Sequence, residues 1–318
     1  MFGFQPKRVP TFNSVTEVRG RKTARSGQVL IEFAFVSLAF YFLLAGTIEM
    51  GRALHGSQAL QNAARVCARE LSVMPMPATI TFREAVGLDP TIAGSRERAA
   101  ADRVRDEVFD SGRLVLNVDG VYGVDYDNLL ASLPLVNQML VPLMIRERIA
   151  IGGGAETDVL RYPGAIYANP NFDAAMPKPG ELGYLVRIPR IISRGSDGAE
   201  TIEMVDVLTE IGEGTGEGPF SILSPGTHKG LVAIRMYYPF QAATLSAYGA
   251  NADGSNRVFE AGSAGLASGA TPVDFTSTTV GTYSGRYGLG SQEALTKKVR
   301  PFRRLLSAQS IFRREVFQ

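Results

Sequence analysis

Residues 29–50 read VLIEFAFVSLAFYFLLAGTIEM, and their composition predicts a helix that crosses a membrane. At about 1.5 Å per residue, this stretch forms a helix of about 33 Å, long enough to span a hydrocarbon core of about 30 Å. Its only charged residues, Glu32 and Glu49, stand near its two ends. Residues 1–27 carry six basic residues and one acidic residue, a local charge of +5 that predicts a cytoplasmic N-terminus and an extracytoplasmic remainder.

A cleavable signal peptide is the first alternative to a membrane anchor. The apolar core of a signal peptide is about 7–15 residues long and ends in a small-x-small cleavage site. Here the apolar core from Phe33 to Ile48 is longer, a carboxylate precedes it, and Leu43-Leu44-Ala45 fits such a cleavage site poorly. The sequence therefore favours a retained anchor.

Glu32 is the most informative residue, because a carboxylate that enters an apolar helix is costly unless it is paired or lies near the interface. An interfacial glutamate at the cytoplasmic edge is one interpretation. The other depends on the preceding residues. Arg25 closes a basic stretch, Gly27 follows, and Glu32 is then the fifth residue of the run that begins at Gln28.

This order of features resembles a type IV prepilin. The resemblance implies that a membrane aspartyl peptidase, the prepilin peptidase, cuts between Gly27 and Gln28, which removes the basic leader. It also implies that Glu32 stays in the mature helix. There its charge can neutralise the free amino terminus of a neighbouring subunit, and such a pair sets the register between subunits.

The run from Ile48, IEMGRALHGSQALQNAARVCAR, resembles the TadE/TadG-type pattern, an I-E-F-G-R element followed by L-x-x-A-A-R-x-G-A-R. The chain departs from this pattern at Met50 and Cys67, where the family prefers an aromatic residue and a glycine. The similar region runs from about Arg25 to Ser72. The resemblance implies a non-enzymatic pseudopilin of a tight-adherence (Tad/Flp) pilus in a bacterial inner membrane. Its implied partners are the prepilin peptidase, other pilin or pseudopilin subunits, the inner-membrane assembly platform and the lipid bilayer.

Steps of three and four residues predict that the helix continues beyond the membrane as one packing stripe. The stripe residues that we expect at a helix contact are Met50, Ala53, Leu60, Ala64, Cys67 and Leu71. Either a globular domain of the same chain or a neighbouring subunit can cover such a stripe, and both can do so at different depths. Pro75 and Pro77 are expected to end the helix.

The remaining pattern predicts an α+β fold, with the long N-terminal transmembrane and extracytoplasmic helix packed on a mostly antiparallel β-sheet domain. The helical pattern covers residues 95–111, with Ser95 as the N-cap. The apolar residues 129–148 are expected to form a short buried helix, which Pro134 and Pro142 interrupt. Strand patterns cover residues 114–118, 184–192, 201–208 and 231–240, and Ser196-Asp197-Gly198 predicts a hairpin turn. Residues 249–290 are expected to form loops or weak edge strands. The expected divisions are 1–27, 28–74, 75–290 and 291–318.

The C-terminal segment KKVRPFRRLLSAQSIFRREVFQ predicts a basic amphipathic helix, with Phe302, Leu305, Leu306, Phe312 and Val316 on one face. This helix either docks on its own domain with solvated arginines, or contacts anionic lipid or an acidic neighbour. The candidate contact residues are Arg303, Arg304, Arg313 and Arg314.

Charge, cysteine and histidine counts argue against other classes of protein. The chain holds 33 basic and 31 acidic residues, and the basic ones gather at its two ends rather than in a folded domain, so no nucleic-acid partner is expected. Its one cysteine, Cys67, allows no intrachain disulfide. The only two histidines, His55 and His228, exclude histidine-rich zinc sites, and no G-x-S-x-G element is present.

Two further motifs give weak chemical signals. Residues 212–218, GEGTGEG, lack the lysine of a phosphate loop and predict an acidic loop instead. Residues 125–128 and 251–254 hold oxygen ligands for calcium, but neither completes an EF-hand loop. We therefore expect no catalytic residue, metal or cofactor. The alternative function is a membrane-anchored extracytoplasmic binding module with no role in a filament.

Overall fold

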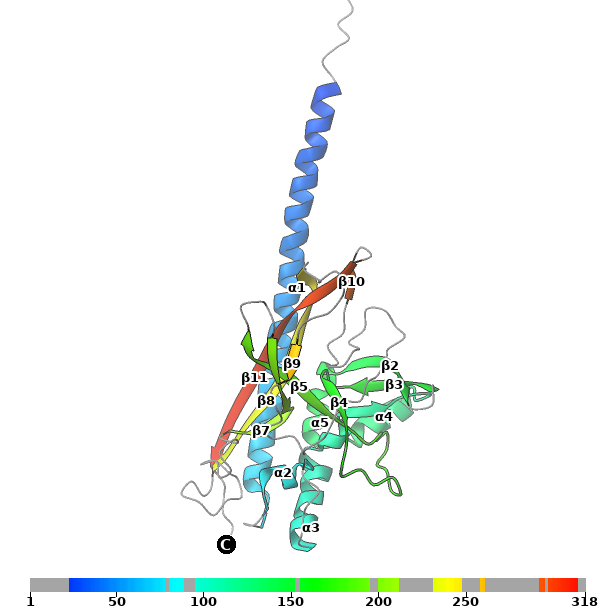
Figure 1. Ribbon diagram of the computed structural model, residues 1–318, viewed down its shortest axis with the longest axis vertical. Helices are drawn as coiled ribbons and strands as arrows, with labels where there is room; N and C mark the ends of the chain where they lie inside the picture. The colour runs from blue at the N-terminus through cyan, green and yellow to red at the C-terminus, as the bar shows by residue number, and fades with distance from the viewer. Residues whose placement is uncertain are drawn as a thin grey trace, which may run out of the picture. The chain divides into compact units, whose positions relative to one another are not determined.

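A computed structural model gives the fold, drawn in Figure 1. It forms two compact units, residues 1–47 and 48–318, and each is described by itself below. The described residues are 23–77, 80–88, 95–151, 155–194, 200–211, 231–247, 258–260, 292–294 and 297–313.

The first helix, α1 (Thr23–Val73), contains no proline, which allows its backbone hydrogen bonds to run without a break. Its described part in the first unit carries the apolar run that begins at Val29. The helix ends where the sequence predicts, because Pro75 and Pro77 follow directly. The amide of Met74 closes its last turn by donating to the Glu70 carbonyl at 3.1 Å.

The second unit holds three small sheets among its described residues. The first has the order β1 (Val115–Asn117), β3 (Ala155–Arg161), β2 (Ile145–Ile151). The second has the order β10 (Gln292–Ala294), β11 (Lys297–Arg313), β8 (Leu231–Ala247), β7 (Leu208–Glu210). The third has the order β4 (Ala165–Ala168), β5 (Tyr184–Arg194), β6 (Glu200–Asp206), β9 (Val258–Glu260). All described pairs are antiparallel except β6 with β9.

Short helices connect these sheets. The one-turn helix α2 (Phe82–Ala85) starts at a capping box, in which Thr81 and Glu84 satisfy each other's backbone amides. The helix α3 (Ser95–Arg103) continues as the π-helical turn η1 (Val104–Val108), and a 3₁₀ turn, η2 (Ser111–Leu114), precedes β1. The helices α4 (Val124–Ala131) and α5 (Leu135–Leu140) follow, and a 3₁₀ turn, η3 (Val141–Leu143), leads toward β2.

The main core lies between the α1 residues of the second unit and the sheet that contains β8. Leu60, Ala64 and Cys67 of α1 share one apolar cluster with Ile234 and Met236 of β8, and all five side chains are fully buried. A smaller cluster packs β1 and β3 against α4 through Leu116, Leu160 and Leu129, together with Val118 and Leu133. The α+β class and the helix-on-sheet arrangement are therefore confirmed for this unit.

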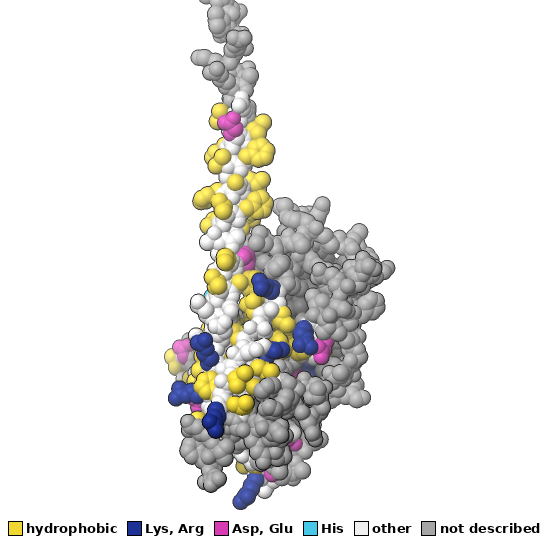
Figure 2. Space-filling model, turned by 90° about the vertical axis from the view of Figure 1, so that its left-hand side faces the viewer, with side chains coloured by type: hydrophobic (Ala, Val, Ile, Leu, Met, Phe, Trp, Pro, Cys, Tyr) yellow, Lys and Arg dark blue, Asp and Glu magenta, His cyan; other side chains and the backbone are white. Residues whose placement is uncertain are grey.

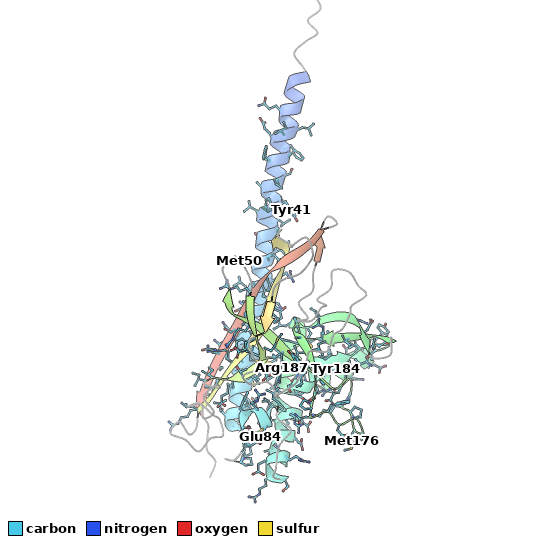
Figure 3. All side chains as sticks on the ribbon, viewed as in Figure 1. Tyr41, Met50, Glu84, Met176, Tyr184 and Arg187 are labelled. Carbon is cyan, nitrogen blue, oxygen red and sulfur yellow. The ribbon has the colours of Figure 1, made fainter. Side chains whose placement is uncertain are left out.

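A buried ion-pair network joins α2 to β5 and β6. Asp206 accepts a hydrogen bond from Arg187 Nε at 3.1 Å and another from Arg83 Nη1 at 3.0 Å. Arg187 and Asp206 are both buried, and the Arg187 guanidinium lies 5.0 Å from the ring centroid of Tyr167. Figure 3 shows Arg187 inside the domain. The one carboxylate therefore pairs with two guanidinium groups that come from different elements.

Several predicted elements are confirmed and others differ in extent. The strand predictions at 114–118, 184–192 and 231–240 correspond to β1, β5 and β8, and β5 and β6 form the expected antiparallel pair. The predicted strand 201–208 is interrupted at Val207, between β6 and β7. The predicted helix from Ser95 ends at Val108, because Phe109 takes an extended conformation. The predicted hairpin turn at 196–198 lies outside the described residues.

The prediction for residues 129–148 was wrong in part. Pro134 separates two short helices, α4 and α5, and the chain turns extended from Ile145 as β2. Residues 249–290 lie mostly outside the described residues, and the described part forms the short strand β9.

The helix predicted for the C-terminal segment was also wrong, because residues 297–313 form the long strand β11. It pairs with β8 from Arg300↔Ala247 to Arg313↔Leu231, and Figure 1 shows the two strands side by side in red and yellow. Ala308 and Ser310 are buried at alternate positions, whereas Ser307, Gln309 and Ile311 are exposed. The burial of this segment thus repeats every two residues, which is the period of a strand.

Candidate assembly helix and membrane anchor

The apolar part of α1 presents its side chains outward on all sides. Every large apolar side chain from Val29 to Leu44 leaves at least 51% of its surface exposed, and Leu43 leaves 70%. Figure 2 shows these yellow side chains along the upper helix. Contact between this much apolar surface and water is unfavourable, so a lipid or protein environment is required around it.

By length and composition, one helix in the described part of the chain, Gln28–Val73, is able to cross a membrane. A helix that spans lipid satisfies its backbone hydrogen bonds internally, and α1 has no proline to interrupt them. The apolar N-terminal helix is thus consistent with a membrane anchor.

Gln28 and Glu32 contact each other on the first turns of this helix. The Gln28 side-chain amide donates to Glu32 Oε1 at 3.0 Å, one helical turn away. This contact engages one carboxylate oxygen and leaves the negative charge in place. Gly27, the residue before the predicted cut, lies within the described bounds of α1. Glycine lowers the stability of a helix interior, which favours local opening at this position.

At the far end of the apolar run, Glu49 and Arg52 form an ion pair. Arg52 Nη1 lies 3.1 Å from Oε1 and 3.2 Å from Oε2 of Glu49, whose side chain is buried. The Arg52 guanidinium also lies 6.0 Å from the ring centroid of Phe240. From the sequence, Glu49 is expected only as the closing charge of the span, and this ion pair was not predicted. The spacing of three residues in I-E-M-G-R is the signal that predicts it.

The predicted packing stripe divides along its length. Met50, labelled on α1 in Figure 3, leaves 66% of its surface exposed, and Ala53 is half-buried. Leu60, Ala64, Cys67 and Leu71 are buried by the second unit itself. The lower stripe is therefore covered by the chain's own domain, and the upper stripe remains accessible to another helix.

Small residues allow this close packing of α1 on its domain. A Cβ added at Gly56 would lie 3.7 Å from atoms of Leu306 and Tyr238, and 3.8 Å from Leu143. At Cys67, full burial raises the pKa of the thiol, so the thiol stays protonated and unreactive at neutral pH. Cys67 is thus a small buried residue on the stripe of α1.

The predicted basic contact residues do not share one helix face. Arg304 and Arg313 are exposed at the two ends of the β11 region that carries described side chains. The side chain of Arg303 and the whole of Arg314 lie outside the described part. A span of nine residues places Arg304 and Arg313 on opposite faces of the sheet.

None of the weak chemical motifs gains support among the described residues. No group of three or more His, Cys, Asp or Glu side chains there is arranged to hold a metal ion. Residues 125–128 lie in the helix α4 rather than in a loop, and His55 is exposed on α1. His228 and the motifs at 212–218 and 251–254 lie outside the described residues.

Comparison with known protein families gives one match. A family model for TadE-like proteins matches residues 27–69, which begin at the predicted cleavage glycine and end two residues before Leu71. Residues 27–69 form a TadE-like domain. Neither the curated proteins nor the solved structures include a match to this chain. TadE-like proteins are associated with membranes and pili, which agrees with the apolar helix inside the TadE-like domain.

Proposed function

We propose that this chain is a minor pseudopilin-like subunit of a Tad-type or related type IV filament machine. Prepilin peptidase cuts between Gly27 and Gln28, and α1 holds the mature protein in the bacterial inner membrane. The N-terminus faces the cytoplasm, and the second unit lies on the extracytoplasmic side of the membrane. The role is structural rather than catalytic.

One observation carries this proposal. The TadE-like match begins at Gly27, the same glycine at which the basic leader ends and the apolar run with Glu32 begins. The basic leader lies outside the matched residues, and the match begins where this leader ends. A soluble protein's core helix has no need of a basic leader, a glycine and a carboxylate in this order.

Cleavage at this position has a clear chemical consequence. Removal of residues 1–27 takes away a charge of +5 and creates a free amino group at Gln28. In lipid this amino group needs a counter-charge, and the Glu32 carboxylate of a neighbouring subunit supplies one. Only one stagger between helices brings the two groups together, so the pair sets the subunit register.

The division of the packing stripe supports helix-to-helix assembly near the membrane. Met50 and Leu54 leave 66% and 54% of their surfaces exposed just beyond the apolar run. Neighbouring pilin or pseudopilin helices, or parts of the inner-membrane assembly platform, are the partners that would cover them. From Leu60 to Leu71 the stripe face of the same helix is covered by its own domain and is closed to such contacts.

A membrane-anchored binding module is the second candidate. The TadE-like match ends at Arg69, and the sheets of the second unit have no match of their own. In this alternative, the leader stays attached to α1, and no filament subunit binds the helix.

Mass spectrometry of the native protein extracted from membranes separates the two candidates. A mature N-terminus at Gln28 supports the pseudopilin, and Gly27→Val should leave the full-length precursor inserted and unassembled. Gly51→Ala is the matched control, because a Cβ at Gly51 meets no atom within 4 Å. A native protein that retains residues 1–27, or that starts beyond the apolar run, would refute the pseudopilin proposal.

A further inference from the structure

The strand β11 is an edge strand over most of its length. β8 pairs with it from Arg300 to Arg313 on one side, and β10 pairs only with Lys297–Val299 on the other. Among the described residues, no strand pairs with the outer edge of residues 300–313. Alternate backbone amides and carbonyls of this stretch therefore point away from the sheet with no strand to receive them.

Natural edge strands usually carry features that block pairing with other chains. In β11 these features stand only at the ends. A bulge lies between Pro301 and Arg303, and exposed arginines stand at positions 304 and 313. The eight residues between the two arginines, LLSAQSIF, carry no charge and contain no proline or glycine. Among the described residues, nothing pairs with the middle of this edge, and addition of a strand to such an edge is a common mode of peptide recognition.

The positions of the two arginines favour an extended partner over a lipid surface. Arg304 and Arg313 lie nine residues apart, about 31 Å along a strand, on opposite faces of the sheet. A flat anionic membrane meets one face of the sheet and so reaches one of these side chains. An added strand runs along the edge itself and passes both.

Charge also disfavours a second copy of β11 as the added strand. Antiparallel pairing centred between Ala308 and Gln309 would place Arg304 opposite Arg313 of the copy, at both ends. Parallel pairing in register would place each arginine opposite itself. Like charges directly opposite each other destabilise a strand pair, whereas opposite charges stabilise it.

We propose that the outer edge of β11 binds an extended segment of another protein, with an uncharged centre of about eight residues and an acidic residue near each end. Main-chain hydrogen bonds to residues 304–313 supply the binding, and the two arginines select the acidic ends. This inference goes beyond the assembly role of α1 and does not depend on cleavage at Gly27.

Hydrogen exchange of the full chain in detergent micelles tests this inference. The probe is a synthetic peptide of alternating Val and Thr with two Glu residues at each end, added in millimolar excess. We expect slower exchange of the amides within residues 304–313 and little change in α4, which is remote in sequence. Replacing Arg304 and Arg313 with Gln should weaken binding by about two- to fivefold for each arginine, because exposed ion pairs contribute modestly. The fold of these variants should be unchanged.

Two control peptides make the result specific. A peptide with the same centre and Lys ends should bind more weakly than the Glu-ended one. A peptide N-methylated at alternate residues should give no protection, because it cannot form the main-chain ladder. Equal protection by all peptides, protection by none, or protection that rises with protein concentration alone would each overturn the proposal, the last because it would indicate self-pairing.

Discussion

At the scale of single residues, substitutions of Glu32 can distinguish membrane anchoring from filament assembly. We expect Glu32→Gln to insert and to be cleaved as the unmodified chain is, because the change removes a charge from lipid and keeps an oxygen that can accept from Gln28. Incorporation beside neighbouring subunits should fall at least about tenfold, since the amino terminus then lacks its counter-charge. Cross-linking of membrane complexes measures this. Glu32→Asp, which keeps the charge, is the control, and full incorporation of the Gln variant would show that the charge pair is dispensable.

Asp206 forms a buried ion pair in the second unit. Asp206→Asn would remove the carboxylate that pairs with the buried Arg187 guanidinium and also accepts a hydrogen bond from Arg83. Breaking a buried ion pair in this way costs about 3–5 kcal/mol of unfolding free energy. The matched control is Asp102→Asn, because Asp102 is exposed and its pair with Arg105 contributes at most about 1 kcal/mol. Denaturant titration of the two variants compares them, and equal losses would argue against the network.

Sequence patterns predicted the roles of some of these residues and not of others. The leader, Gly27 and Glu32 lie within one short stretch, so their order is visible before any folding is considered. The Arg83–Asp206 contact joins residues 123 positions apart, and no local pattern connects them. Contacts of this kind arise only when α2 reaches the third sheet, which is a property of the fold as a whole.

At the scale of elements, α1 is held to its domain by small side chains. Ala64 is fully buried between α1 and the sheet, whereas its neighbour Arg65 is exposed. We expect Ala64→Leu to cost about 1–3 kcal/mol through overpacking, and Arg65→Leu to change stability by about 0.5 kcal/mol or less. Thermal unfolding in detergent distinguishes them. A loss of similar size for both variants would mean that the close contact does not limit stability.

The error at the C-terminal segment has a physical cause. Leu305, Leu306 and Phe312 suggest a helical face when hydrophobicity alone is considered. The inward positions of β11 between Leu306 and Phe312 are Ala308 and Ser310, a small and a polar residue, so the two-residue period of burial does not appear as a period of hydrophobicity. Pairing with β8 determines the conformation of β11. Because β8 is distant in the sequence, no local pattern in residues 297–313 indicates this pairing. The end of α1, by contrast, depends on the adjacent Pro75 and Pro77, and its prediction was correct.

At the scale of the whole molecule, the apolar part of α1 and the second unit need different surroundings. The apolar part of α1 requires lipid or other helices, whereas the second unit builds its own core around residues 60–71. The proposed cleavage at Gly27 would therefore change the partners of the helix without touching that core. The second unit should fold equally well in the precursor and in the mature chain.

The orientation of the whole chain in the membrane is the last prediction. The charge of +5 on residues 1–27 should keep them in the cytoplasm, since basic residues flanking a span resist translocation. Reporter fusions at Pro75 and after Gln318 should both report an extracytoplasmic location, because the described residues contain no second helix able to span a membrane. Replacing the six basic residues of the leader with Gln should reduce or invert insertion, whereas replacing the same number of basic residues in the C-terminal segment should not. A cytoplasmic signal from either fusion in the unmodified chain would show that α1 does not anchor the protein in this orientation.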